Sequence, residues 1–373
     1  MHELQLSLTP KEAAIPELLK SIVAKKLNVK ESSINHIQVV KKSIDSRGKF
    51  PIVLLKVRAF VGKKPDYQYE NVFKYDNVAN GREVVVVGSG PAGLFAALRL
   101  IEYGLKPIVL ERGKEVLDRK KDIAQLNRNV ALNVESNYCF GEGGAGTFSD
   151  GKLNTGVNNP RIGWVLEQFV KAGAREEILY DAKPHVGTDV LLTVVQNLRK
   201  RIIDLGGEVR FNTQVTGIRK ENGRICGLEV NGSELIDCDQ VILAIGHSAR
   251  DTFEMLLAEK IPMEPKPFAM GVRIEHKQTT IDAAQYGRVN PVLPPADYKL
   301  VKHLDNGTVY TFCMCPGGYV VAAASEEGRV VTNGMSYVDR DGENANAALL
   351  VTVNPEEFPY EGNLGGMIWQ EKL

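Results

Sequence analysis

Residues 84–113 constrain the fold more than any other part of the chain. The segment begins with four valines, passes through a glycine-rich turn with the spacing G-x-G-x-x-G at Gly88, Gly90 and Gly93, and ends in a second apolar run followed by Glu111. A continuous β-branched run is typical of a central parallel strand. With a helix after the turn and a second strand beyond it, the segment predicts a Rossmann-type nucleotide-binding unit.

Each glycine of this turn has its own expected role. Gly88 permits the tight turn, Gly90 lets the backbone approach a pyrophosphate, and Gly93 lets the helix pack on the strand. Free N–H groups at the start of the helix would face the phosphates. Glu111 can accept hydrogen bonds from ribose hydroxyls and would repel a 2′-phosphate, so the motif disfavours NADP and leaves NAD and FAD open.

The layout after Glu111 favours FAD over NAD. A simple dehydrogenase continues to alternate strands and helices through one sheet. This chain instead has a glycine-rich irregular region at 135–159, two helices, and a meander of short strands with hairpin turns at Asn222-Gly223 and Asn231-Gly232. An apolar strand at 241–245, which we expect to be buried, follows the meander. We interpret this insertion as that of a flavoprotein domain along which FAD lies extended.

We predict an α/β chain of three parts. Residues 1–79 form a small α+β domain of order β-α-β-β, residues 80–258 form an FAD-binding Rossmann-type domain with an inserted β-meander, and residues 259–373 form a β-rich substrate-side lobe that we expect to be incomplete. Thr9 and Pro10 predict a helix start, with a break at Pro16. Thr188 is predicted to be the N-cap of a helix over 189–205.

Composition sets bounds on function. The 373 residues carry 46 Lys and Arg and 46 Asp and Glu, so no global charge draws the chain to nucleic acid or to an anionic membrane. No apolar stretch approaches the ~18–20 residues of a membrane span, and the N-terminus does not have the pattern of a signal peptide. An odd number of cysteines, five, favours reduced thiols and a cytoplasmic protein.

Several motifs resemble those of a known family. The GSGPAG turn followed by LERG resembles the FAD-binding flavoprotein superfamily that includes glutathione reductase. Narrower motifs resemble bacterial FAD-dependent dehydrogenases, or NAD(P)/FAD-dependent oxidoreductases, with a small extra N-terminal domain. These motifs are KKSIDSRGKF (41–50), SNYCFGEGGAGTFSDGKLNTG (136–156), HVGTDVL (185–191), VILAIGHSARDT (241–252) and TFCMCPGGYVVAAASEEGRVVTNGMS (311–336).

The resemblance implies FAD as cofactor and assigns residues to it. The implied cofactor-binding positions are Gly88, Ser89, Gly90, Pro91, Ala92 and Gly93 at the pyrophosphate, Glu111, Arg112 and Gly113 at the ribose, Val215 at the adenine, Ala244, Ile245 and Gly246 at a second turn, and a nest of Gly141, Gly143, Gly144 and Gly146 followed by Ser149, Asp150 and Lys152. The superfamily's last strand, ending in Gly-Asp, does not occur before Leu373. We therefore expect the chain to be the N-terminal portion of a longer protein.

The expected function is that of an FAD-dependent oxidoreductase. Hydride equivalents would pass from a small-molecule substrate through flavin N5 to a second acceptor, with NAD(P)H as one candidate second substrate. Two alternatives remain: an FAD-dependent enzyme that modifies nucleic acid such as tRNA, and a nucleotide-bound scaffold without catalysis. The sequence assigns no catalytic residue.

Five side chains invite a chemical role. Cys313 and Cys315 form a C-x-C pair whose sulfurs a regular strand would put on one face. Because no second Cys or His pair stands at zinc spacing, we expect structural thiols and no metal. Lys152 could lie at the flavin N1–C2 edge, contact a phosphate or be exposed. His247 and Cys139 could lie near the cofactor or be structural, and Arg250-Asp251 is expected to be a helix-start pair.

Overall fold

The computed structural model describes residues 1–62, 75–287, 292–305 and 307–373. Most of the linker expected at 62–81 lies outside these ranges. The N-terminal part has the predicted β-α-β-β order, with its elements at β1 (His2–Leu8), α1 (Pro10–Ala13), α2 (Pro16–Leu27), β2 (Ile34–Asp45) and β3 (Ile52–Val61). Thr9 caps α1 and forms a reciprocal capping box with Glu12, and the helix breaks before Pro16 as expected.

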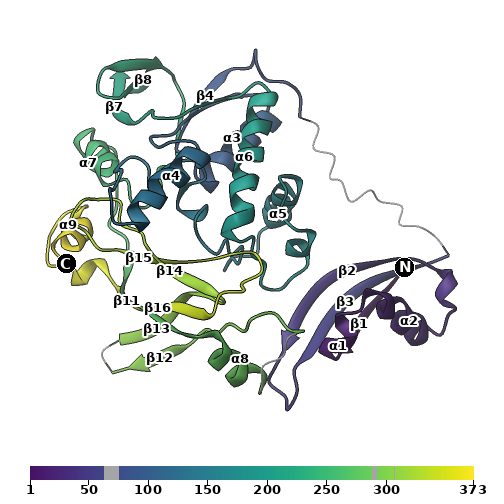
Figure 1. The fold of residues 1–373 in the computed structure, drawn as a ribbon. Helices are drawn as coiled ribbons and strands as arrows, with labels where there is room; N and C mark the ends of the chain where they lie inside the picture. Colours follow the sequence, from purple (N-terminus) through teal and green to yellow (C-terminus); the bar gives the residue numbers. More distant parts are fainter. Residues whose placement is uncertain (63–74, 288–291, 306) are drawn as a thin grey trace.

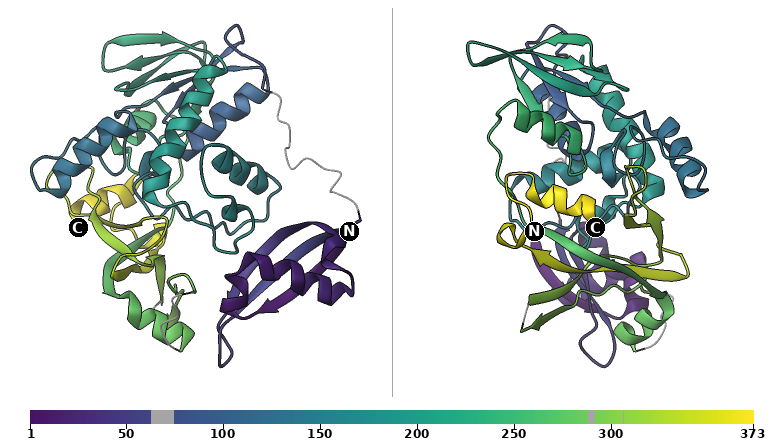
Figure 2. Two further views of the ribbon diagram at one scale, coloured as in Figure 1. Left: turned by 45° about the vertical axis from the view of Figure 1, so that its right-hand side comes forward. Right: turned by 90° about the vertical axis from the view of Figure 1, so that its left-hand side faces the viewer.

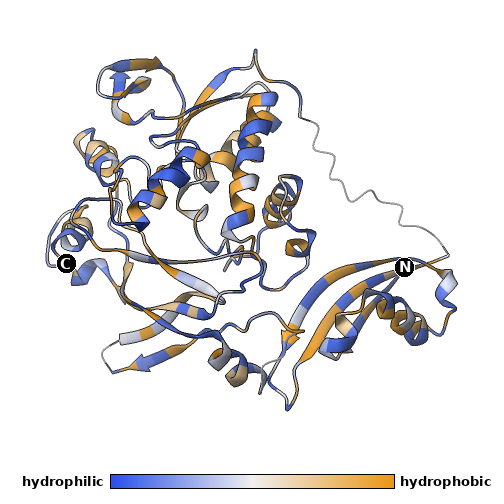
Figure 3. Ribbon diagram, in the orientation of Figure 1, coloured by the Kyte–Doolittle hydropathy of each residue, from blue (hydrophilic) through white to orange (hydrophobic). Residues whose placement is uncertain are grey.

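The N-terminal sheet is antiparallel, in the order β1-β3-β2, and its helices cover one face (Figure 2). Apolar side chains of β3 alternate toward α2, which explains the mostly hydrophobic colour of β3 in Figure 3. This part contacts the rest of the chain. The Lys42 N–H donates to Tyr180 O and Lys42 O accepts from the Ala182 N–H, while Leu293 joins the N-terminal core.

A parallel sheet forms the centre of the next part, and it has the order β10-β4-β5-β6 (Figure 1). Its strands are β4 (Glu83–Val87), β5 (Lys106–Leu110), β6 (Glu208–Arg210) and β10 (Val241–Leu243). One face packs on helices α3 (Pro91–Glu102) and α6 (Thr188–Asp204), with Val86 and Val109 in that core. The other face, through Val85 and Val87, packs on the β-meander. The predicted valine strand is thus buried on both faces.

Helices and a meander complete these layers. The helices are α3 (Pro91–Glu102), α4 (Val116–Asn127), α5 (Arg161–Lys171), α6 (Thr188–Asp204) and α7 (Arg250–Ala258). The meander consists of β7 (Val215–Glu221), β8 (Arg224–Val230) and β9 (Glu234–Asp237), and its turns have positive φ at Asn222, Gly223, Asn231 and Gly232. Those angles are the ones that type I′ hairpins require.

An antiparallel lobe follows α7. Its main sheet has the order β11-β16-β13-β12, with strands β11 (Phe268–Lys277), β16 (Asn344–Val353), β13 (Gly307–Cys315) and β12 (Val301–Leu304). The hairpin of β14 (Gly318–Ala322) and β15 (Thr332–Ser336) lies between this sheet and the parallel-sheet domain (Figure 1). Helices α8 (Gln278–Tyr286) and α9 (Gly365–Lys372) flank the lobe. The predicted fold class, an α/β FAD-domain fold with a β-rich lobe, is confirmed.

Three local expectations are wrong. Thr188 is the first residue of α6 rather than its N-cap: Gly187, with φ +86°, caps the helix, and the Thr188 hydroxyl donates to Thr147 O at 3.0 Å. The strand expected to be buried at 241–245 ends at Leu243, which is 41% exposed because β10 is the edge of the sheet. β13 is not regular at its C-x-C pair, because a bulge interrupts its register before Cys315.

Candidate cofactor-binding site

A cavity of about 600 Å³ opens at the carboxyl ends of the parallel strands β10, β4 and β5. Its walls come from the first turn of α3, the glycine-rich loop, the start of α7 and the β14–β15 hairpin. In open α/β sheets, ligands bind in the crevice outside these strand ends. The lining includes Glu111 after β5 and Val215 at the start of β7, together with Thr332 and Asn333 on β15.

The glycines at this cavity separate into two kinds. A β-carbon on Gly93 would lie 1.8 Å from Gly88 O, and one on Gly88 would lie 2.4 Å from Ala244 O, so packing within the protein demands both. A β-carbon on Gly90 would meet only Gly144 Cα at 3.7 Å, and Gly90 has φ −66°, which any residue adopts. The fold itself does not require a glycine at position 90. A ligand that approaches this backbone does, and a pyrophosphate fits that requirement.

Glu111 is enclosed by protein donors. Its Oε2 accepts from the Ser89 N–H at 2.8 Å and the Ser89 hydroxyl at 2.7 Å, while Oε1 accepts from Gly113 N–H and Gly141 N–H, each at 2.9 Å. A carboxylate offers about four acceptor sites, and these four donors fill them. A ribose hydroxyl could bind Glu111 only by sharing or replacing one of these bonds. Ribose binding by Glu111 stays a prediction.

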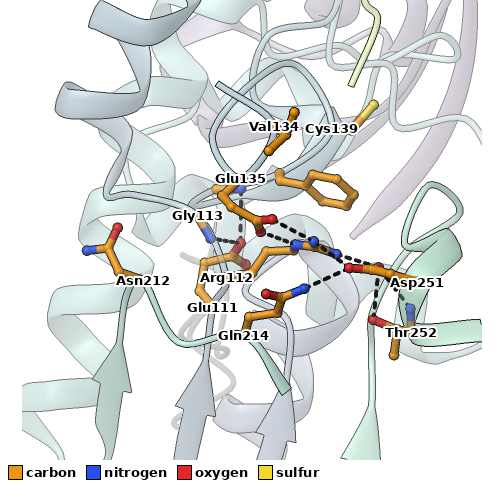
Figure 4. A network of polar contacts seen from close by, with 12 residues as sticks. Glu111, Arg112, Gly113, Val134, Glu135, Cys139, Asn212, Gln214, Asp251 and Thr252 are labelled. Carbon is orange, nitrogen blue, oxygen red and sulfur yellow. Dashed lines mark hydrogen bonds and ion pairs between the residues drawn. The ribbon is translucent and has the colours of Figure 1, made fainter. Parts of the chain in front are cut away.

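Arg112 connects three segments beside Glu111 (Figure 4). Its guanidinium donates to Glu135 at 2.6 and 3.0 Å and to Asp251 at 2.8 and 2.7 Å, and it lies 4.3 Å from the centre of the Phe140 ring. Gln214 donates to the same Asp251 carboxylate at 2.7 Å. Burial alone would lower the pKa of Arg112, but hydrogen bonds to Asp251 and Glu135 outweigh it and raise the pKa above its usual value. Arg250 and Asp251 are the first two residues of α7, as expected, and Asp251 also binds Arg112.

The charge at this end of the cavity is negative. Glu111, Glu135 and Asp251 carry three carboxylates against two guanidinium groups, that of Arg112 and that of Arg119, whose charge interacts with Glu111. A phosphate on the ribose 2′-hydroxyl, as in NADP, would be repelled here, whereas an adenosine without that phosphate would not. The structure therefore adds two carboxylates to the sequence argument against a 2′-phosphate.

Arg119, on α4, holds the glycine-rich loop in place. Its side chain is fully buried and donates to four backbone carbonyls, those of Asn137, Tyr138, Gly141 and Glu142. Burial lowers the pKa of Arg119 to about 10. A β-carbon on Gly141 would lie 2.4 Å from Arg119 Cδ, so a glycine is needed there for the loop to wrap around the guanidinium. Sequence reasoning missed Arg119 because a charged residue in a charge-rich helix is normally solvated.

Asp150 joins the glycine-rich loop to the antiparallel lobe. Its buried carboxylate accepts from Arg340 at 2.7 and 3.1 Å and from the Ser336 hydroxyl, and it pairs with Lys152 at 3.0 Å. Although burial raises the pKa of Asp150, Arg340 and Lys152 lower it to about 2. The lobe that forms one wall of the cavity is thereby fixed to the domain that forms the others.

The structure brings most of the predicted site residues to the cavity. The predicted residues that line it are Gly88, Gly90, Pro91, Ala92, Glu111, Arg112, Gly144, Gly146, Val215, Ala244, Ile245 and Gly246. Those that support it from behind are Ser89, Gly93, Gly113, Gly143 and Lys152, and Gly143 N–H donates to Ser89 O at 3.0 Å. Cys139 and His247 also line the cavity. Binding of FAD by each of these residues stays a prediction.

The sequence analysis missed other lining residues. Arg250 and Arg329 bring cationic side chains to the cavity, and Ser325, Thr332 and Asn333 bring polar groups from the β14–β15 hairpin. Arg250 also pairs with Glu326 at 3.2 Å, which links α7 to the hairpin. No local signal could have identified the hairpin residues, because their role depends on a lobe that folds back over the parallel sheet.

The chain matches three protein families along its length. Residues 82–238 match the family described as "FAD binding domain", and residues 267–373 match "FAD-dependent protein, C-terminal domain-like". Residues 1–60 match "Domain of unknown function (DUF8436)". The cavity lies between the two FAD-related regions, with walls from both.

One relative is similar over nearly the whole chain. A protein of Clostridium beijerinckii is 48% identical over 373 residues, which cover 95% of this chain and 70% of that protein. Digeranylgeranylglycerophospholipid reductase 2 of Methanococcoides burtonii is 25% identical over 185 residues, or 43% of this chain and 45% of the reductase. The chain thus spans less than half of that reductase's length.

Solved structures resemble the chain more distantly. FqzB has a TM-score of 0.34 at 16% identity and halogenase PltM a TM-score of 0.36 at 10% identity, and the matches cover 75% and 78% of this chain and 55% of each of those chains. None of the helices within the described ranges has both the length and the apolar character needed to cross a membrane. On its similarity to the Clostridium beijerinckii protein and its two FAD-related regions, the chain belongs to a family of FAD-dependent proteins.

Proposed function

We propose that the protein is an FAD-dependent oxidoreductase of the dehydrogenase type, which passes hydride equivalents from a small-molecule substrate to a second electron acceptor. The observation that carries this proposal is the cavity of about 600 Å³ lined both by the glycine turn of the parallel sheet and by the β14–β15 hairpin. We propose that FAD lies in it with its adenosine near Glu111 and Val215, its pyrophosphate at the glycine turn and its flavin toward the hairpin.

Different residues of the cavity lining would bind different parts of FAD. Arg112 and Val215 would border the adenosine, with Glu111 behind the ribose. The first turn of α3 and the loop at Gly144 would hold the pyrophosphate, because free helical N–H groups there favour an anion. Bound FAD supplies a flavin ring that accepts hydride at N5 and gives up its electrons to an acceptor.

The chain's own residues would orient the flavin and exclude water. The wall opposite the glycine turn is formed by Ala323, Ser325, Thr332 and Asn333, with Cys139 beside it. Ala323 is buried, and its carbonyl accepts a weak hydrogen bond from Cys139 Sγ at 3.8 Å, so the hairpin packs on the loop. Lys152 lies behind this wall against Asp150. We propose that substrate enters on the hairpin side and that NAD(P)H is a candidate second substrate.

A second candidate function is FAD-dependent modification of nucleic acid. Although the whole chain has zero net charge, its N-terminal part is basic. Residues 1–60 contain eleven Lys and Arg against five Asp and Glu. A basic domain beside a cofactor domain favours an RNA partner through its phosphates. The third possibility, a nucleotide-bound scaffold without catalysis, would be favoured by a closed or absent flavin cavity, and the cavity of about 600 Å³ weighs against it.

Anaerobic reduction tests these proposals. FAD-loaded protein should be bleached by a nicotinamide or another small-molecule hydride donor and recover its colour with an added quinone or dye acceptor. The Arg112→Met variant should take up FAD more weakly, whereas Arg161→Met, at an exposed position on α5, should not. Resistance to every small-molecule donor, together with salt-sensitive binding of tRNA, would replace the dehydrogenase proposal by the second candidate.

A further inference from the structure

The C-x-C pair lies at an irregularity of strand β13. The strand pairs with β16 in regular register up to Phe312 opposite Ala348, and the next pair is Cys315 opposite Asn346, so β13 contains one extra residue. Cys313 has φ +46°, a left-handed conformation that residues with a side chain rarely adopt. At the bulge the Cys315 thiol donates to Cys313 O, with Sγ 3.3 Å from that oxygen.

Cationic groups surround this bulge. Lys152 Nζ lies 3.5 Å from Cys315 Sγ, and Arg273 donates to Cys313 O at 3.3 Å and to Asn346 Oδ1 at 2.7 Å. Asp150, which is 3.0 Å from Lys152, is the acidic group nearby and is already held by Arg340 and Ser336. A negative charge that forms on either sulfur is therefore stabilised by Lys152 and Arg273.

The two thiols differ in environment. Cys315 is fully buried, whereas Cys313 is only partly buried and so can meet another molecule. The neighbouring Cys315 side chain is the main reason that the pKa of Cys313 falls to about 6, with Lys152 and Arg273 adding to it against the effect of burial. The Cys313 side chain, together with burial, raises the pKa of Cys315. One thiol is activated and accessible, and its neighbour is held protonated.

Structural and metal roles account less well for this arrangement. A packing role needs neither the left-handed backbone nor the lysine. Among the described residues, no three His, Cys, Asp or Glu side chains gather in a way that could hold a metal ion. Both cysteines are reduced in the structure, as are the other three.

We propose that Cys313 and Cys315 form a redox-active dithiol, in which Cys313 attacks the disulfide of a small thiol compound and Cys315 resolves the product. The Cys313 thiolate forms a bond to one sulfur of that disulfide, and the other sulfur leaves as a thiolate that takes up a proton. Cys315 then loses its proton and attacks Cys313 Sγ, which expels the second small thiol. The protein dithiol is oxidised by two electrons and the disulfide is reduced to two thiols; two equivalents of free thiol reverse the reaction.

The test uses the full chain equilibrated with buffers of reduced and oxidised glutathione. Free thiols are then trapped with iodoacetamide and the peptides are mapped by mass spectrometry. The wild type should form an intramolecular Cys313–Cys315 disulfide as the buffer becomes more oxidising. Cys315→Ser should stop with glutathione attached to Cys313, and Cys313→Ser should leave Cys315 unmodified. Cys139→Ser, a nearby cysteine outside the pair, should behave as the wild type.

A pH profile of alkylation gives a second readout. Cys313 should react with a midpoint near pH 6, well below that of Cys238, whose pKa burial raises. Lys152→Gln should move the Cys313 midpoint upward, and circular dichroism should show that the variant remains folded. The proposal is overturned if no intramolecular disulfide forms in any glutathione buffer. It is also overturned if Cys313 alkylates with the midpoint of Cys238.

Discussion

Both donors of Ser89, the backbone N–H and the hydroxyl, end on one oxygen of Glu111, at 2.8 and 2.7 Å. This pair connects the glycine turn after β4 to the end of β5. The other oxygen of Glu111 accepts from Gly113 and Gly141 and so adds the glycine-rich loop. One buried carboxylate therefore fixes the positions of three segments that line the cavity.

Glu111→Gln should destabilise the protein by about 2 kcal/mol. The amide NH₂ of glutamine is a donor, so it cannot accept the hydrogen bonds of the surrounding donors and leaves buried N–H groups unpaired. Ser89→Ala removes one of the four bonds and should cost about 1 kcal/mol. Urea unfolding measures both. Glu83→Gln is a matched control, since its pair with Lys106 is exposed and worth about 0–1 kcal/mol. Equal stability of the Glu111 variant and the control would contradict this account.

Arg119→Lys should loosen the glycine-rich loop although the charge is kept. A lysine ammonium has three donors on a flexible stem and cannot span the four carbonyls that the guanidinium reaches. We expect a loss of about 3 kcal/mol in the free energy of unfolding and faster hydrogen exchange of the backbone amides at 137–142. Arg161→Lys, at an exposed position, should change neither. Unchanged hydrogen exchange in the Arg119 variant would show that the glycine-rich loop keeps its conformation without the guanidinium.

The sequence analysis succeeded where local pattern and tertiary packing agree. The valine strand, the turn at Gly88 and the meander hairpins depend on neighbours close in the chain, so spacing and turn chemistry were sufficient to predict them. Helix α4 was missed because its sequence, VLDRKKDIAQLN, is rich in charge, and its buried Arg119 is satisfied by carbonyls up to 23 residues away.

Only one face of the candidate site was predicted, because only that face depends on residues close together in the chain. The glycine turn and the ends of β4, β5 and β10 form one face of the cavity, and that face follows from the motif. The opposite face comes from the β14–β15 hairpin, and Arg112 meets Asp251 across 139 residues. The bulge at Cys313 and Cys315 depends on pairing with β16 and has no signature in the sequence of β13 alone.

Acid should weaken the connection that Asp150 makes between the parallel-sheet domain and the antiparallel lobe. Its pKa falls from 3.8 to about 2 on folding, so it contributes stability above pH 3.8 that is lost as the pH falls from 3.8 towards 2. At ~1.4 kcal/mol per pKa unit, the full contribution is about 2 kcal/mol. Between pH 5 and pH 2, urea unfolding should show a steeper loss for the wild type than for Asp150→Asn. Asp118→Asn, at an exposed ion pair, should follow the wild type. Parallel pH profiles for wild type and Asp150→Asn would argue against this coupling.

The central claim is that the glycine-lined cavity holds FAD, and a titration of FAD into wild type, Gly90→Val and Gly93→Ala tests it most directly. Flavin fluorescence follows binding, and circular dichroism follows folding. The wild type should bind FAD. Gly90→Val should remain folded and lose binding, because a β-carbon on Gly90 would meet no protein atom closer than 3.7 Å, whereas Gly93→Ala should fold poorly, because its β-carbon would lie 1.8 Å from Gly88 O. Equal FAD affinity of folded Gly90→Val and wild type, or no FAD binding by the wild type, would contradict the claim.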